Sequence, residues 1–468
     1  MKTKLPPGSK TDSWSQGRLW LTMKATFRLS IVFVLAAALS SMIGCREEVV
    51  PEVYAPTDDH AGYLASLKHI DLDETALGKD WITAAHTSVT DPMPIELPYR
   101  ESVYFSAAEA QALGLRISVE QGRRLDVDAK RGISEDFRVF IDLFRVDEQQ
   151  NVHVASGSTH DDRLTVDVKR KGAYVLRIQP ELLRGGTILL TVESKPSLAF
   201  PVRGHDMQDA ISHFGDPRDG GTRMHEGIDI LAPRGTEVLA PAIAHVRHVG
   251  TSVRGGNVVW MVDEGGTAYY FAHLDTQSAR SGTVVAVGDV IGTVGNTGNA
   301  LTTVPHLHFG VYEITGYRRG AVDPYYYLYD AGRQPADVVA DTGKLGRCVR
   351  TATERVPFIA SRPPAGQTNR ELPPDTLVLI IGAFQNSYRV RLPDGVVGSI
   401  DTRAIAALDD PLDTRILNEP KAVLDRPHPQ ASVIRVATSG TQLEVLGRFD
   451  RYRYVEIEEN AVGWIWDL

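Results

Sequence analysis

Two histidines, His306 and His308, have the spacing needed to place two imidazole rings side by side. One residue separates them, so on a β-strand both side chains point to the same face of the sheet. Two neighbouring imidazoles can share a metal ion, or one can bind the ion while the other contacts its water. In a chain with 14 histidines such a pair also arises by chance, so it needs further partners.

A second candidate pair of metal ligands, His225 and Asp229, lies earlier in the chain. Gly227 and the β-branched Ile228 disfavour a helix here, so we expect a loop that runs into a short strand. Histidine nitrogen and carboxylate oxygen suit zinc, and three protein ligands leave a fourth position for water. His225 and Glu226 start an H-E-x-x pattern, but the next ligand position is Asp229 rather than a histidine, which argues against a helical H-E-x-x-H site.

The composition is that of a globular protein with several domains. The 468 residues suggest about three domains, and 43% hydrophobic with 23% charged residues excludes wholesale disorder. A formal net charge of −9 without a long basic run argues against a nucleic-acid partner. Two cysteines exclude a disulfide framework and a cysteine-rich zinc site.

Apolar residues that alternate with period two predict a mainly β, multidomain protein. Over residues 98–196 the short alternating runs are separated by glycines, which predicts an antiparallel β-sandwich. This segment resembles the jelly-roll modules of bacterial secreted peptidases. Residues 45–97 lack sustained periodicity, and we interpret them as a tether with one short helix around residues 60–67.

The C-terminal region contains an internal repeat with a spacing of 65 residues. Thr376–Gly382 corresponds to Thr441–Gly447, and later residues keep the same register. We therefore predict two related units of short strands, over residues 345–408 and 409–468. Both resemble bacterial SH3-like (SH3b) modules, which are small β-barrels often attached to cell-wall hydrolases.

The N-terminus has the pattern of a secretory signal peptide over residues 1–44. Its apolar run, Leu29–Ile43, follows Lys24 and Arg28. A helix of this length rises about 22 Å, which is shorter than the roughly 30 Å hydrocarbon core of a membrane.

The end of that signal, Ser41–Cys45, resembles the lipobox of bacterial lipoproteins. The resemblance implies that Cys45 becomes the N-terminus and carries a lipid that anchors the exported protein to a membrane. The residue after the cysteine is Arg46 rather than Asp, which favours the outer membrane facing the periplasm. An ordinary signal peptide with an incidental cysteine is the alternative.

The histidine motifs and their glycine-rich β surroundings, taken together, resemble the M23 (LytM/lysostaphin-type) zinc metallopeptidases. The resemblance extends from about Gly204 to Leu328, within a domain that we place over residues 197–335. The matching segments are Ile211–Gly215, His225–Ile230, Gly256–Val259, Tyr270–Leu274, Val287–Gly292, Gly295–Gly298, His306–Phe309 and Val322–Pro324.

The resemblance implies a β-rich fold with a groove open at both ends, and a role for each residue of the histidine motifs. His225, Asp229 and His308 would bind one zinc ion per chain. His273 and His306 would be the catalytic histidines.

We therefore predict an exported zinc metalloendopeptidase that hydrolyses peptide cross-links of bacterial peptidoglycan. Its expected partners are peptidoglycan peptides and the membrane that lipidated Cys45 reaches. The main alternative is a non-catalytic LytM-type scaffold that activates other cell-wall hydrolases. A secreted peptidase acting on glycine-rich proteins is a second alternative.

Overall fold

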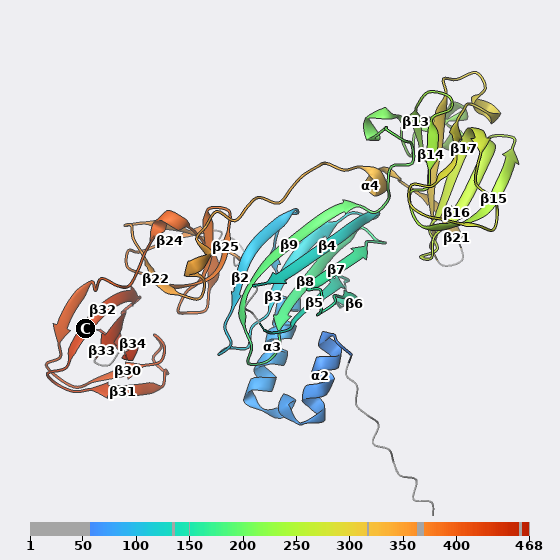
Figure 1. The fold of residues 1–468 in the computed structure, drawn as a ribbon. Helices are drawn as coiled ribbons and strands as arrows, with labels where there is room; N and C mark the ends of the chain where they lie inside the picture. The colour runs from blue at the N-terminus through green and yellow to red at the C-terminus, as the bar shows by residue number, and fades with distance from the viewer. Residues whose placement is uncertain are drawn as a thin grey trace, which may run out of the picture. The chain divides into compact units, whose positions relative to one another are not determined.

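The computed structural model describes residues 57–132, 136–148, 150–315, 318–362, 369–457 and 461–467. The predicted signal peptide and Cys45 lie outside these residues. Strands dominate the described part, so the predicted mainly β fold class is confirmed (Figure 1). No helix in the described ranges is long and apolar enough to cross a membrane.

Two helices, α2 (His60–His69) and α3 (Ala76–Thr90), precede the first sheet and are joined by the 3-10 turn η1 (Leu72–Glu74). The side chains of Asp59 and Thr75 cap their N-termini by accepting hydrogen bonds from backbone N–H groups. The short helix predicted around residues 60–67 is confirmed by α2.

The helices pack on the sheet that contains β5 (Val139–Arg145), as Figure 1 shows. Trp81 of α3 is only 1% exposed, clusters with Leu67 and Phe140, and donates from Nε1 to a backbone carbonyl at 2.9 Å. The predicted tether over residues 45–97 is therefore wrong for the part that these helices occupy. The sequence did not predict that a helix packs here, because the apolar residues of α2 do not form one helical stripe.

Two sheets face each other around one apolar cluster and form a β-sandwich. The first sheet has the order β1 (Met93–Pro94), β3 (Leu113–Val119), β8 (Gly172–Pro180), β5, β6 (Val152–Ser156). The facing strands have the order β2 (Tyr99–Phe105), β9 (Gly186–Pro196), β4 (Arg123–Arg131), β7 (Arg163–Asp167). Alternate residues of β4, such as Leu125 and Val127, are fully buried between the sheets.

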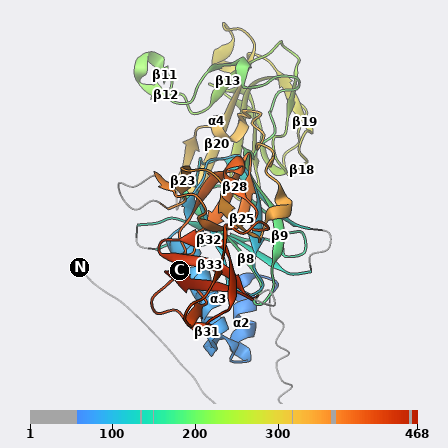
Figure 2. The same cartoon turned by 90° about the vertical axis from the view of Figure 1, so that its left-hand side faces the viewer.

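A separate sheet with its own apolar cluster carries the histidine motifs. Its main strand order is β10 (Ala210–Ser212), β13 (Ile228–Leu231), β20 (His306–Thr315), β17 (Ala268–Gln277), β16 (Gly256–Val262), β15 (Ala244–Ser252), β18 (Val284–Val285). Further strands and helices of this region are β14 (Glu237–Leu239), β19 (Val290–Val294), β21 (Arg318–Val322), η2 (Met207–Asp209), η3 (Asp219–Gly221), η4 (Gly298–Ala300) and α4 (Tyr325–Leu328). A small hairpin of β11 (Pro217–Arg218) and β12 (Arg223–Met224) stands apart from β13 and β20 (Figure 2).

The repeat in the sequence is a repeat in the fold. The first unit has the strand order β22 (Cys348–Thr351), β25 (Leu377–Phe384), β26 (Ser387–Arg391), β27 (Val397–Asp401), β23 (Val356–Ala360), β24 (Asn369–Leu372), with β28 (Ile405–Ala406) beside β22 and the turns η5 (Thr342–Lys344) and η6 (Thr402–Ala404). The second has the order β29 (Asp413–Ile416), β32 (Gln442–Phe449), β33 (Tyr452–Ile457), β34 (Ala461–Trp466), β30 (Lys421–Leu424), β31 (Val433–Ala437).

Corresponding strands of the two units begin at or close to the 65-residue spacing seen in the sequence. β25 and β32 both have eight residues, and their first residues, Leu377 and Gln442, are 65 positions apart. The strand orders also correspond one to one. Each unit has its own buried cluster, so the two units are duplicated elements that each close a small core.

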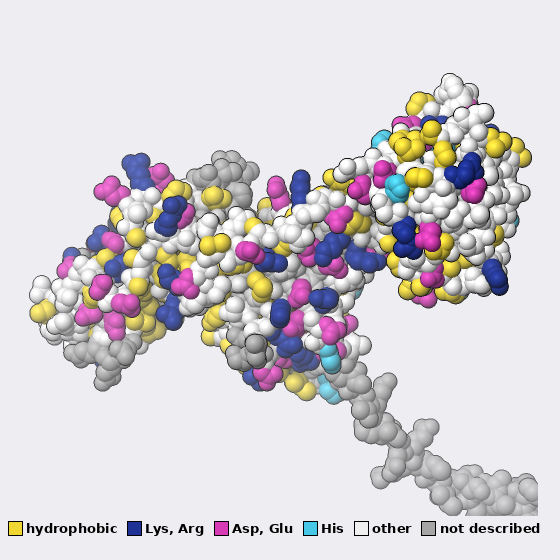
Figure 3. Space-filling model, turned by 45° about the horizontal axis from the view of Figure 1, so that its top comes forward, with side chains coloured by type: hydrophobic (Ala, Val, Ile, Leu, Met, Phe, Trp, Pro, Cys, Tyr) yellow, Lys and Arg dark blue, Asp and Glu magenta, His cyan; other side chains and the backbone are white. Residues whose placement is uncertain are grey.

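Positive and negative side chains are interspersed over the face shown in Figure 3, without one large patch of either sign. This distribution agrees with the small negative net charge of −9 for the chain. A surface of this kind gives no electrostatic footprint for nucleic acid on that face.

Candidate active site

The central strands of the histidine-bearing sheet bring two of the predicted ligands into direct register. Asp229 of β13 is paired with His308 of the antiparallel neighbour β20. The residues on either side of His308, Leu307 and Phe309, are fully buried in the core beneath the sheet. The predicted alternation is therefore confirmed, because the apolar residues of this strand face inward and leave His306 and His308 on the opposite face.

His225 lies in a loop directly before β13, as the sequence predicted. The loop approaches β20 closely at Gly227, where an added Cβ would lie 2.4 Å from the carbonyl oxygen of Phe309. Only glycine allows this approach, and it places His225 Nε2 2.9 Å from His308 Nδ1. The side chain of His225 is 3% exposed.

Three donor atoms from these residues meet at one point. Besides the contact between the two histidines, Asp229 Oδ1 lies 3.0 Å from His308 Nδ1 and 3.1 Å from His225 Nε2. Three ligands about 2.1 Å from one tetrahedral ion would lie about 3.4 Å apart, so small adjustments would admit an ion. Among the described residues, these three side chains form the group whose donor atoms could hold a metal.

His225 Nδ1 lies 2.9 Å from the carbonyl oxygen of His213, which accepts, and 3.0 Å from Arg218 Nη2, which donates. In the tautomer with the proton on Nδ1, the bond to His213 forms and Nε2 presents a lone pair toward the Asp229 carboxylate and the His308 ring. One proton cannot satisfy all three atoms, whereas a divalent cation accepts electron pairs from each, so the donor set fits zinc.

Arg218 of β11 fixes the carboxylate of Asp229. Its Nη2 donates to Asp229 Oδ2 at 2.7 Å, which leaves Oδ1 directed at the two histidines. Burial raises the pKa of Asp229, but hydrogen bonds with His225 and His308 outweigh it and hold that pKa well below its usual range. The carboxylate is therefore ionised at neutral pH. No spacing in the sequence marked Arg218 as part of the site, because Arg218 comes from a separate hairpin.

The two predicted catalytic histidines lie next to this group. The ring centroids of His273 and His306 are 5.0 Å apart, and that of His273 is 6.1 Å from His308. His273 Nδ1 donates to the carbonyl of Thr297 and His306 Nδ1 to that of Val304, each at 2.9 Å. When these two rings are neutral, neither Nε2 atom carries a proton. Burial lowers the pKa of His273 to about 4, which keeps its ring neutral at pH 7.

His273 is held in an uncommon backbone conformation, with φ +64°. Its N–H donates to Gly255 O at 2.7 Å, so both the backbone and the ring of His273 are bound to neighbouring turns. Those turns touch at Gly298, where an added Cβ would lie 2.3 Å from the backbone of Arg254. The glycine-rich segments thus position a histidine, a role that their spacing alone did not reveal.

All five predicted residues line one cavity of about 510 Å³. The cavity wall also includes Tyr270, whose ring packs edge-on against His308 at 5.7 Å. Glu226 lines the wall but accepts a hydrogen bond from Tyr312 rather than joining the ligands. The arrangement therefore combines a cation site, two imidazoles and room for an extended chain, which suits hydrolysis of a peptide.

Known proteins match this chain in the same region that carries the histidine motifs. Residues 223–324 match peptidase family M23. The chain is 36% identical over 138 residues to the L-Ala–D-Glu endopeptidase of Bacillus subtilis (strain 168), covering 28% of this chain and 42% of that protein. It is 37% identical over 118 residues to the uncharacterized lipoprotein YgeR of Escherichia coli (strain K12), covering 25% and 43%. The match thus spans less than half of either relative.

Among solved structures, the chain is similar to the catalytic domain of the antimicrobial peptidase lysostaphin from Staphylococcus simulans. The sequence identity is 30%, with 25% of this chain and 89% of that chain covered and a TM-score of 0.23.

Proposed function

We propose that this chain, whose residues 223–324 match peptidase family M23, is a zinc-dependent endopeptidase that hydrolyses peptide cross-links of bacterial peptidoglycan. The observation that carries the proposal is the convergence of His225, Asp229 and His308, with His273 and His306 beside them in one cavity. The match to an endopeptidase from Bacillus subtilis supports the substrate class.

The chemistry divides between the bound ion and the chain's own side chains. A zinc ion held by His225, Asp229 and His308 would lower the pKa of a bound water and polarise the scissile carbonyl. His306 Nε2 accepts a proton in the cavity and returns it to the leaving amine. His273 Nε2, left unprotonated because Nδ1 donates to Thr297, accepts a hydrogen bond in the cavity and so helps to orient the attacking water.

The alternative of a non-catalytic scaffold is disfavoured by the completeness of this site. A scaffold needs no buried His–Asp–His group and no pair of imidazoles with fixed tautomers beside it. Here both catalytic histidines have Nδ1 bound to a backbone carbonyl, which orients Nε2 for proton transfer. Such orientation has a use in catalysis and none in docking alone.

Metal removal tests the proposal directly. We expect a chelator such as 1,10-phenanthroline to stop the clearing of purified peptidoglycan sacculi, and stoichiometric zinc to restore it, because three side chains of this chain provide the binding site. Turbidity of the suspension is the measurement. Clearing that persists after the zinc content has fallen below about a tenth of an ion per chain would contradict a zinc-dependent reaction.

Arg254 is expected to contribute to substrate choice. It lines the cavity and forms no ion pair with another described residue, whereas Arg218 pairs with Asp229 and Arg223 with Asp219. Stem peptides of peptidoglycan carry free carboxylates, and a guanidinium binds such groups well. We expect Arg254→Ala to raise KM for a soluble stem peptide about three- to tenfold and to change kcat little.

The matched control for this prediction is Arg247→Ala, because Arg247 is an exposed arginine of β15 that does not line the cavity. The two variants remove the same charge from the domain. An unchanged KM for Arg254→Ala, or an equal rise in both variants, would show that Arg254 does not contact the substrate.

The remaining parts of the chain are proposed to place the enzyme in the cell envelope. We infer a lipoprotein signal peptide over residues 1–44, with acylation of Cys45 and attachment to the outer membrane, facing the periplasm. The match to a lipoprotein supports this location. The sandwich and the two repeats, which we interpret as SH3-like modules, would space the active site from the membrane and engage the wall. Radiolabelled palmitate incorporated into the wild type but not into Cys45→Ala tests the anchor.

A further inference from the structure

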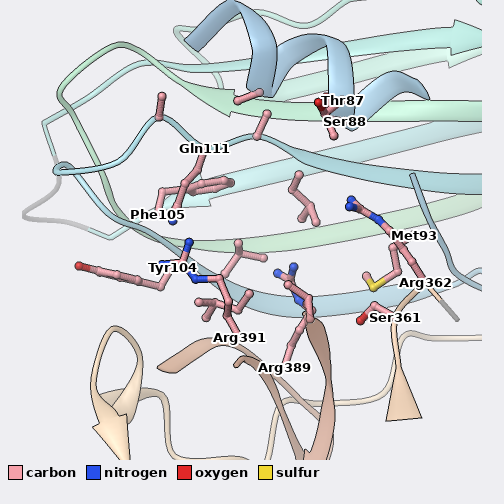
Figure 4. Close-up of a pocket in the computed structure, with 17 residues that line it drawn as sticks. Thr87, Ser88, Met93, Tyr104, Phe105, Gln111, Ser361, Arg362, Arg389 and Arg391 are labelled. Atoms are coloured by element: carbon pink, nitrogen blue, oxygen red, sulfur yellow. The ribbon is translucent and has the colours of Figure 1, made fainter. Parts of the chain in front are cut away.

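A second cavity, of about 230 Å³, lies where the β-sandwich meets the first repeat (Figure 4). The two parts share a sheet here, because β2 of the sandwich pairs with β25 of the repeat, Ser102 with Ala383 and Val103 with Gly382. Helix α3 also lines this cavity. The cavity is therefore built by three separate elements that meet around it, and it is remote in sequence from the histidines.

Arg389 is buried at this junction with one donor unused. Its side chain is 8% exposed, and its Nε donates to Glu101 Oε1 at 2.7 Å. Glu101 is fully buried and its other oxygen accepts from Tyr99 at 2.8 Å. Arg389 Nη2 is buried and has no hydrogen-bond partner among the residues that the structure describes. A buried charged donor without an acceptor is unfavourable, so this atom calls for a hydrogen-bond acceptor.

Two more arginines border the same space. Figure 4 shows Arg389 and Arg391 rising from the repeat toward the sandwich, with Arg362 on the far side of the space. Arg391 pairs with Glu109 at 2.7 Å and Arg362 with Asp91 at 3.3 Å. The two carboxylates are 48% and 64% exposed, so these ion pairs contribute little and can yield to a competing anion.

The rest of the wall combines apolar and uncharged polar side chains. Met93, Val103, Leu113 and Val397 form apolar parts of it, with Gln111 and the hydroxyls of Thr87 and Ser361 among them. The volume is below the roughly 300–1,000 Å³ of sites for drug-sized ligands, so the occupant is small. Guanidinium groups bind a carboxylate through paired hydrogen bonds, the apolar wall accepts a small side chain, and the hydroxyls suit an amide.

We propose that this cavity binds the C-terminal carboxylate of a short peptide whose last residue has a small apolar side chain. The carboxylate accepts from Arg389 Nη2 and from a rim arginine. The side chain lies against Val103 and Val397. The site is independent of the zinc site and of the proposed peptidase reaction, so it can be present even if that reaction is not.

Calorimetric titration of the full chain with N-acetyl-Ala-Ala, in its D and L forms, tests this site. The C-terminal amide of the same peptide is the matched control ligand, and inorganic phosphate is the control anion. We expect at least one form of the acid to bind about tenfold or more tightly than its amide, because charged hydrogen bonds are lost in the amide. We also expect the acid to bind more tightly than phosphate, which lacks the apolar group.

Two variants locate the binding. Ala84→Phe fills the cavity from α3 without changing any charge, whereas Thr83→Phe places the same ring on an exposed position of that helix. Arg389→Lys keeps a cation beside Glu101 but removes Nη2. We expect Ala84→Phe and Arg389→Lys to reduce affinity for the acid about tenfold or more, with Thr83→Phe unchanged. Melting temperatures show which variants are folded.

Three results would overturn the proposal. The first is no binding of either acid up to about 10 mM, which would mean that water satisfies Arg389. The second is equal binding of acid and amide, or tighter binding of phosphate. The third is binding that Ala84→Phe leaves intact but His306→Ala removes, since that would place the peptide in the groove of the peptidase domain.

Discussion

Replacement of His308 by alanine is expected to reduce bound zinc from one ion per chain to below about a tenth and to abolish sacculus hydrolysis. His308 Nδ1 lies 2.9 Å from His225 Nε2 and 3.0 Å from Asp229 Oδ1, so its loss opens one corner of a three-ligand site. Loss of a hydrogen-bond partner of a ligand already costs about 10–100-fold in metal affinity, and loss of a ligand costs more. Plasma mass spectrometry of the dialysed protein measures the metal.

The matched control is His248→Ala, which removes an exposed histidine of β15 in the same domain. This variant should retain zinc and activity. The far-ultraviolet circular dichroism of both variants should equal that of the wild type, because Leu307 and Phe309 still anchor β20 in the core. Full zinc content in a folded His308→Ala protein would show that the ion binds elsewhere.

Replacement of His306 by alanine should also abolish catalysis, but this variant should retain zinc. His306 is not among the three converging ligands, but its ring lies 5.0 Å from His273 beside them. Removal of a general acid–base group lowers kcat by about 10²–10⁴-fold. Steady-state hydrolysis of a soluble cross-linked peptide, measured on protein with verified zinc content, provides the rate.

The pair of variants distinguishes ligand from catalytic group because each has a different expected metal content. A His306→Ala protein that loses zinc together with activity would assign His306 to the metal instead. A variant with wild-type kcat would remove His306 from the reaction and leave proton transfer to His273 or to water.

The local structure around the candidate ligands was predictable from sequence because it follows simple rules, whereas the choice of His225, Asp229 and His308 as ligands came from the resemblance to the M23 peptidases. The alternation across His306 and His308 follows from the two-residue period of a strand, and the short strand after His225 follows from Gly227 and the β-branched residues beyond it. The repeat could also be predicted from the sequence, because corresponding residues of the two copies stay 65 positions apart. In each case the signal lies within a few neighbouring residues or in a fixed spacing.

The elements that were missed depend on contacts between distant segments. Arg218 reaches Asp229 from a separate hairpin, and Thr297 holds His273 through a backbone carbonyl, which any residue type could supply. Helix α3 within the predicted tether was missed because its burial depends on the contact of Trp81 with Phe140, a residue of the sheet that is distant in the sequence. Tertiary packing, rather than local pattern, determines these features.

The most direct test of the account is mass spectrometry of the products that the full-length zinc-loaded protein releases from purified peptidoglycan sacculi. We expect fragments with new peptide amino and carboxyl termini, intact glycan bonds, and none of these fragments from His306→Ala. Sacculi whose peptides remain uncut by protein that holds one zinc ion per chain would contradict it.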